Sequence, residues 1–144
     1  MKIRKATPAD SFTLALLASR MWSASAEELA LEFSELTASL EAACFLVLDD
    51  DKAVGFAQCQ LRHDYVEGCE TSPVGFLEGI YVDDAYRRCG VARALLSACE
   101  DWTRSVGCSE FASDCEIDNH DSLAWHLKNG FDEMGRTIWF AKKL

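Results

Sequence analysis

The spacing of apolar residues along the chain predicts an alternation of strands and helices. Apolar positions three and four residues apart indicate amphipathic helices, and short runs of β-branched and aromatic residues between turn residues indicate strands. The predicted strands are Lys2–Ala6, Cys44–Leu48, Ala53–Arg62, Val74–Val82, Glu110–Cys115 and Arg136–Ala141. The predicted helices begin at Thr7 or Asp10, Ala26, Tyr86 and Ser122, and they end at Met21, Leu40, Val106 and Lys128. This order predicts an α/β sheet with helices on its faces, in which the second to fourth strands form a meander.

The helical periodicity also predicts which side chains are buried. In the first helix we expect Phe12, Leu16 and Leu17 to face the core. The second helix repeats the spacing at Leu29, Ala30, Phe33, Leu36 and Leu40.

The amino-acid composition favours some classes of binding partner over others. The 144 residues carry a net charge of −10, from 14 basic and 24 acidic residues, which disfavours nucleic acid and favours cationic partners. The seven cysteines are odd in number and form no C-x-x-C pair, so we interpret them as reduced thiols. The three histidines lack the spacing of metal ligands. We therefore expect one cytoplasmic domain over residues 1–144, with no metal, no membrane span and no leader segment.

A turn between the fourth strand and the third helix carries unusual chemistry. The stretch VDDAYRRCGVARALL places Arg87, Arg88 and Gly90 at the start of a long helix. Free backbone N–H groups and the positive end of the helix dipole favour an anion there, and arginines add phosphate-binding charge. Alternatively, the arginines are only solvated and Gly90 only eases the turn. The chain contains neither the P-loop pattern nor the G-x-G-x-x-G pattern of dinucleotide sites.

The same turn resembles the pyrophosphate-binding loop of the GNAT N-acetyltransferases, through R-x-x-G-x-A at Arg87, Gly90 and Ala92. A second stretch, from Asn119 through His126 to Gly130 and Phe131, resembles the family pattern N-x-x-A-x-x-x-Y-x-x-x-G-F, with Ser122 at its fourth position. The resemblance implies a central mixed, mostly antiparallel twisted sheet flanked by about four helices, with acetyl-CoA as acetyl donor. The residues it assigns to coenzyme A are Ile80, Tyr81, Val82, Arg87, Arg88, Cys89, Gly90, Val91, Ala92 and Asn119.

Within that family, ETSPVGFLEGIYV and EFASDCEIDN are similar to the bacterial aminoglycoside 6′-N-acetyltransferases. This likeness implies antibiotic resistance by acetylation of a 6′-amine, and a homodimer to which Thr137–Phe140 contributes. It assigns the cationic substrate to Trp22, Tyr65, Glu70, Glu78, Asp114 and Glu133.

Acetyl transfer to an amine requires a proton acceptor, because aliphatic amines are mostly charged at neutral pH. Glu78 is our candidate, since it is a carboxylate among apolar strand neighbours; Asp114 would orient the amine or share the proton. His126 stands where many family members have a tyrosine, so it either protonates the leaving thiolate or only packs. Two alternatives stay open: another amine as acceptor, such as a polyamine or a protein amine, or a module that binds acetyl-CoA without turnover.

Overall fold

A computed structural model describes all 144 residues and shows a five-stranded sheet in the order β1-β2-β3-β4-β5. The strands are β1 (Lys2–Lys5), β2 (Ala42–Asp49), β3 (Lys52–Arg62), β4 (Val74–Val82) and β5 (Phe111–Ser113). The first four are antiparallel neighbours and β5 runs parallel to β4. The predicted mixed, mostly antiparallel sheet is confirmed.

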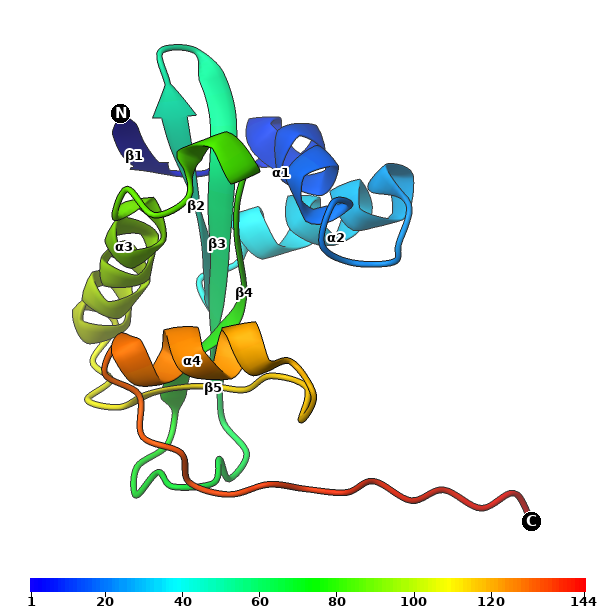
Figure 1. Cartoon of the computed structure of the whole chain (residues 1–144). Coiled ribbons are helices and arrows are strands. Elements are labelled where there is room, and N and C mark those ends of the chain that lie inside the picture. Colours follow the sequence, from blue (N-terminus) through cyan, green and yellow to red (C-terminus); the bar gives the residue numbers. More distant parts are fainter.

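Helices cover both faces of this sheet (Figure 1). They are α1 (Ser11–Ala18), α2 (Ala26–Ala38), α3 (Val91–Ser105) and α4 (His120–Lys128), with short 3-10 turns at Pro8–Asp10 and Asp84–Tyr86. Successive side chains of β2 point to opposite faces of the sheet. Phe45 and Val47 belong to the core beneath α3, whereas Cys44 and Leu46 belong to the core beneath α1 and α2. No helix is long and apolar enough to cross a membrane.

A β-bulge interrupts β4 at Glu78. Gln58 of β3 pairs with Gly79, but the next residue, Cys59, pairs with Leu77, so Glu78 has no partner on β3. The bulge reverses the alternation of side chains, because Leu77 and Ile80 belong to the same core although they are three residues apart. The face of β4 that carries Tyr81, towards α1 and α2, therefore also carries Glu78.

Strands β4 and β5 separate beyond the bulge. Their pairing covers only Gly75–Leu77 against Phe111–Ser113, while β4 continues to Val82. Residues 78–82 consequently have a strand on one side only. An extended ligand can bind the backbone on the other side, as a strand would.

The predicted face and end of the first helix are partly wrong. The helix begins at Ser11 and ends at Ala18, and its buried apolar residues are Leu14, Ala15, Leu17 and Ala18. Phe12 and Leu16 are 55% and 44% exposed. The helix presents Leu14, Leu17 and Ala18 to the core, so Phe12 and Leu16 lie on its outer side. Leu40 is also exposed, because α2 ends at Ala38.

The predicted last strand, Arg136–Ala141, does not form. The chain after α4 has no regular structure, and Figure 1 shows it running away from the domain in an extended course. Ile138, Trp139 and Phe140 are 74%, 88% and 91% exposed. A strand requires a neighbour for its backbone hydrogen bonds, and this segment pairs with no strand of its own chain.

Candidate active site

The carboxylate of Glu78 is held by a guanidinium that the sequence analysis did not identify. Arg62, the last residue of β3, donates from Nη2 to Oε1 at 2.7 Å and from Nε to Oε2 at 3.1 Å. Its carbon Cζ lies 3.6 Å from the ring centroid of Phe76. Hydrogen bonding to Glu78 and then the charges of Glu78 and Asp114 raise the pKa of Arg62. Arg62 therefore pairs with one of the two carboxylates that were expected to share the site and is influenced by the charge of the other.

Asp114 follows directly after β5 and is exposed. Its side chain makes no ion pair or hydrogen bond within the chain, in contrast to the paired Glu78. It directly follows Ser113, which pairs with Leu77, the residue before Glu78. Of the two carboxylates, Asp114 is the one available to a cation from solvent.

Trp22, in the turn after α1, packs directly on the bulge. A Cβ added to Gly79 would lie 2.5 Å from Cζ2 of Trp22. The indole also meets Phe56 edge-on, with ring centroids 6.0 Å apart. The structure thus brings Trp22, one of the aromatic residues predicted to line the site, against the residue that follows Glu78, and the close contact explains why that residue is glycine.

The ring of His126 is oriented by two serines. Its Nδ1 lies 2.7 Å from the carbonyl oxygen of Ser122, which can only accept, so this nitrogen carries a proton. In the neutral ring Nε2 then accepts from the hydroxyl of Ser113, 2.8 Å away. Ser113 also lies 3.3 Å from the carbonyl oxygen of Leu77, at the point where β4 and β5 part. Ser113 was missed because its contact with His126 depends on how α4 packs on β5.

The turn before α3 has the conformation of an anion site. Arg88 and Gly90 both adopt left-handed backbone angles, with φ of 61° and 79°. The first hydrogen bond of the helix runs from the N–H of Ala94 to Gly90, so the N–H groups of Val91, Ala92 and Arg93 have no partner. A Cβ at Gly90 would touch nothing within 4 Å. Glycine is required there by the positive φ, not by crowding within the chain.

The two arginines of this turn differ in their surroundings. Arg87 is already engaged, because its Nε donates to the carbonyl oxygen of Val82 at 2.8 Å and its Nη1 pairs with Asp84 at 2.8 Å. Arg88 is exposed and makes no ion pair. Cys89 is exposed and donates to the carbonyl oxygen of Arg87. Arg88 is thus the side chain left free for a phosphate.

The other residues assigned to coenzyme A have local structural roles. Asn119 caps α4 by accepting from the N–H of Ser122 at 3.1 Å. Ile80 and Val82 pack into the core beneath α3, which leaves only their backbone for a ligand. Burial and then a hydrogen bond to Asp83 raise the pKa of Tyr81, whose side chain faces α1 and α2.

Three of the residues predicted to bind the substrate lie outside the sheet, on connecting segments. Tyr65, 75% exposed, and Glu70 belong to the connection between β3 and β4, and Glu133 follows α4 and pairs with Arg136 at 2.7 Å. The two segments meet where Met134 packs against Gly68. None of the three side chains forms a hydrogen bond or an ion pair with Glu78. Glu110 was missed by the sequence analysis: its carboxylate accepts from the N–H groups of Glu70 and Thr71 at 2.9 and 2.7 Å and so holds this connection.

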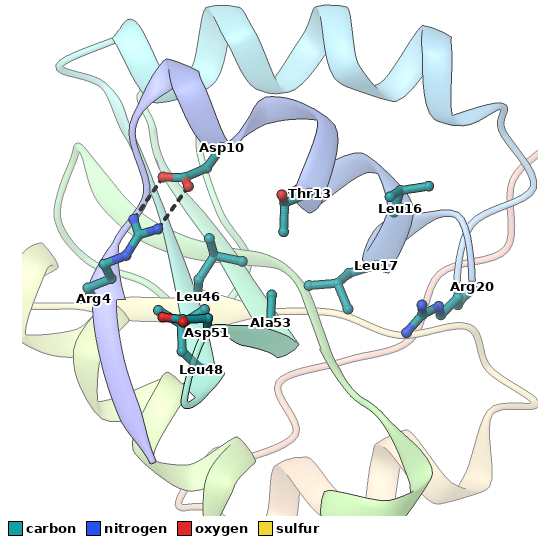
Figure 2. A pocket seen from close by; sticks show the side chains of 10 residues that line it. All are labelled: Arg4, Asp10, Thr13, Leu16, Leu17, Arg20, Leu46, Leu48, Asp51 and Ala53. Carbon is teal, nitrogen blue, oxygen red and sulfur yellow. Dashed lines mark hydrogen bonds and ion pairs between the residues drawn. The ribbon is translucent and has the colours of Figure 1, made fainter.

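A pocket outside the predicted site lies between α1 and the β2–β3 hairpin (Figure 2). It encloses about 400 Å³, with Leu17, Leu46 and Ala53 in its wall and the Arg4–Asp10 ion pair at one end. No residue of the predicted site lines it. The separation of β4 and β5, with the anion site at its upper end, is therefore the candidate active site.

Comparison with protein families shows which family the chain belongs to. Residues 11–131 match the Acetyltransferase (GNAT) family. The chain belongs to the GNAT family. A relative from Stenotrophomonas maltophilia, aminoglycoside N(6′)-acetyltransferase type 1, is 45% identical over 143 residues, which cover 99% of this chain and 93% of the relative. A protein of the same name from Acinetobacter haemolyticus is 40% identical over 144 residues, which cover 100% of this chain and 99% of that one.

Solved structures of GNAT enzymes share the fold. An apo aminoglycoside antibiotic 6′-N-acetyltransferase from Acinetobacter haemolyticus matches with a TM-score of 0.93 and 40% identity, covering 100% of this chain and 99% of the other. The enzyme AAC(6′)-Iy in complex with the bisubstrate analogue CoA-S-monomethyl-acetylneamine matches with a TM-score of 0.92 and 35% identity, covering 99% and 98% of the two chains. The fold expected from the two GNAT motifs is confirmed.

Proposed function

We propose that this protein transfers an acetyl group from acetyl-CoA to the 6′-amine of aminoglycoside antibiotics and thereby confers resistance. The observation that carries the proposal is its similarity, over essentially its whole length, to enzymes named for this reaction. A related structure binds a molecule that joins coenzyme A to an aminoglycoside fragment. The exposed carboxylate and aromatic wall beside Glu78 suit a polycation.

Coenzyme A would bind along the separation of β4 and β5. Its pyrophosphate fits the free N–H groups of residues 91–93 and the unpaired Arg88, and its extended arm fits the unpaired backbone of residues 78–82. Backbone N–H groups on that edge would also stabilise the charge that develops on the thioester oxygen. The residues present therefore fit this co-substrate.

Glu78 would accept the proton of the substrate amine, directly or through one water. The neutral nitrogen then attacks the thioester carbon, the C–N bond forms, the nitrogen releases its second proton to water, and the C–S bond breaks. The leaving thiolate takes up a proton, for which His126 is the candidate donor: in the doubly protonated ring Nε2 carries the proton to be given up and the Ser113 hydroxyl accepts from it, and loss of this proton returns the neutral ring in which Nε2 accepts from Ser113. Asp114 would bind the ammonium group, and Trp22, Tyr65, Glu70 and Glu133 would form the outer wall.

We further propose that residues 1–144 act as one cytoplasmic domain in a homodimer. Exposed Trp139 and Phe140 lie in a segment whose sequence favours a strand, and β5 is an edge strand with one free side. The free edge of β5 in a second copy of the chain would give this segment a strand to pair with. The seven free cysteines are typical of a reducing compartment.

Mass spectrometry of kanamycin or tobramycin incubated with acetyl-CoA and the protein tests the activity. We expect a gain of one acetyl group at the 6′ nitrogen, and none on an aminoglycoside with a hydroxyl at this position. Detecting free thiol is unsuitable, because the protein itself carries seven thiols. Coenzyme A binding without acetylation of either drug would refute the proposal that an aminoglycoside is the acceptor, and it would favour another amine or a binding module.

Glu78→Gln should lower kcat about 100-fold or more while coenzyme A still binds.

A further inference from the structure

Two contacts with β4 hold Arg62 in addition to its ion pair with Glu78. Its backbone ends β3 opposite Val74, and its guanidinium lies flat enough on Phe76 to approach the ring centroid to 3.6 Å. Phe76 and Glu78 are two residues apart and face the same way, so the guanidinium passes over the first to reach the second. The aromatic contact and the two hydrogen bonds leave the group little freedom to rotate.

The bulge explains why such a support is needed. Glu78 has no partner on β3, so the regular ladder does not fix the backbone that carries it. The carboxylate is mostly covered, with 17% of its side chain exposed, and Arg62 is the residue that donates to its oxygens. Without that donor the carboxylate would lose its only ion pair.

We propose that Arg62 is a positioning residue for acetyl transfer: it holds Glu78 in the orientation from which the carboxylate accepts the proton of the amine. This inference rests on the proposed function of Glu78. A carboxylate has about four sites for accepting hydrogen bonds, and Arg62 occupies two of them. The remaining sites stay open to the amine or to a bridging water.

The ion pair between Arg62 and Glu78 also gives the two acidic residues, Glu78 and Asp114, different roles. Because Arg62 balances the charge of Glu78, an incoming ammonium group is attracted more strongly to the unpaired Asp114. Asp114 then binds the cation and Glu78 receives the proton. Arg62→Ala would remove this distinction and leave Glu78 free to rotate towards any cation.

Lysine cannot replace the arginine fully. It carries the charge but lacks the planar fork that reaches both carboxylate oxygens, and it stacks less well on Phe76. We therefore expect Arg62→Lys to retain part of the activity, whereas a role in neutralising charge alone would leave this variant close to wild type.

The experiment is a double-mutant cycle of Arg62→Ala and Glu78→Gln, with kcat and both KM values measured by mass spectrometry of the acetylated drug. We expect Arg62→Ala to lower kcat about 10- to 100-fold with an unchanged KM for acetyl-CoA, and Arg62→Lys to fall between it and wild type. In the Glu78→Gln background, Arg62→Ala should change kcat by less than about twofold. Arg104→Ala is the matched control, since Arg104 also forms ion pairs but on the exposed end of α3.

The other results would overturn the proposal. An unchanged kcat for Arg62→Ala would show that Glu78 needs no support. An equal fall in both backgrounds would show that Arg62 acts on the site independently of Glu78, for example through stability. If Glu78→Gln alone has no effect, the proposed role of Glu78 fails, and if wild type acetylates no aminoglycoside, the proposed function fails, so these failures remain distinguishable.

Discussion

Trp22 and Gly79 are in direct contact: Cζ2 of the indole occupies the space that a Cβ on the glycine would enter. This contact places an aromatic wall next to the residue proposed to accept the proton. Gly79→Ala should push the ring aside, which we expect to destabilise the fold by about 1–3 kcal/mol and to raise KM for the aminoglycoside. Denaturant unfolding and steady-state kinetics measure the two effects.

Gly135→Ala provides the matched control, because a Cβ there would come no closer than 3.9 Å to Glu67 and the backbone is not left-handed. We expect this variant to bind substrate as wild type does. A Gly79→Ala protein with wild-type stability and KM would show that Trp22 moves without cost and plays no part in binding.

Gly90 is a test of the anion site, because its constraint is conformational alone. Its φ of 79° favours glycine, tolerates asparagine and penalises alanine by about 1 kcal/mol. We expect Gly90→Ala to raise KM for acetyl-CoA at least several-fold, and Gly90→Asn to raise it less. Calorimetric titration with coenzyme A measures the loss directly. Equal binding by all three proteins would place the pyrophosphate elsewhere.

The ion pair of Arg4 and Asp10 makes stability depend on pH. Hydrogen bonding to Arg4 lowers the pKa of Asp10 from 3.8 to about 2. The folded state therefore holds this proton less tightly than the unfolded state, so the stabilisation is complete above about pH 5 and is lost as the pH falls towards 2. We expect Asp10→Asn to cost about 1–2 kcal/mol at neutral pH and less at about pH 3.

Urea unfolding of both proteins at the two pH values gives the comparison. Asp101→Asn is the control, because Asp101 pairs with Arg104 on the exposed surface with 79% of its side chain accessible. A pH dependence that is the same in wild type and in Asp10→Asn would remove Arg4–Asp10 as its source.

The exposed C-terminal segment is a test of the proposed dimer. Light scattering should give twice the 16.0 kDa of one chain for the intact protein, and a monomer after removal of residues 136–144. Trp139→Glu should have the same effect without shortening the chain, since burying an unpaired charge is costly. As a control, Leu31→Glu alters a residue on α2 that is 72% exposed. A full-length monomer would refute the proposal.

The sequence predicted the elements that are determined by residues close together in the chain. The bounds predicted for β4, Val74–Val82, are those observed, because β-branched and aromatic residues fill it and turn residues enclose it. The anion turn was also predictable, since Gly90 and the start of α3 adjoin in the chain. The last strand was not, because a strand needs a partner and no pattern in Arg136–Ala141 says which edge supplies one.

The candidate site was predicted only in part. Glu78, Asp114 and His126 were named as candidates from three stretches of sequence, but the residues that hold Glu78 and His126 were missed. Arg62 is 16 positions before Glu78 and Ser113 is 13 positions before His126. These contacts depend on the register of β3 with β4 and on the docking of α4, neither of which follows from residue spacing.

The bulge at Glu78 has a consequence for how this protein can change. The carboxylate proposed to accept the proton is placed by an offset of one residue within the sheet, whereas Tyr65, Glu70 and Glu133, proposed to bind substrate, lie on connecting segments. Those segments accept substitutions and insertions more readily than a paired strand does. With the proposed roles, the preference among drugs can change through substitutions in the connections while the position of Glu78 is kept. Deletion of a single residue at 78 or 79 would instead remove the register shift in β4 and with it the proposed acetyl transfer.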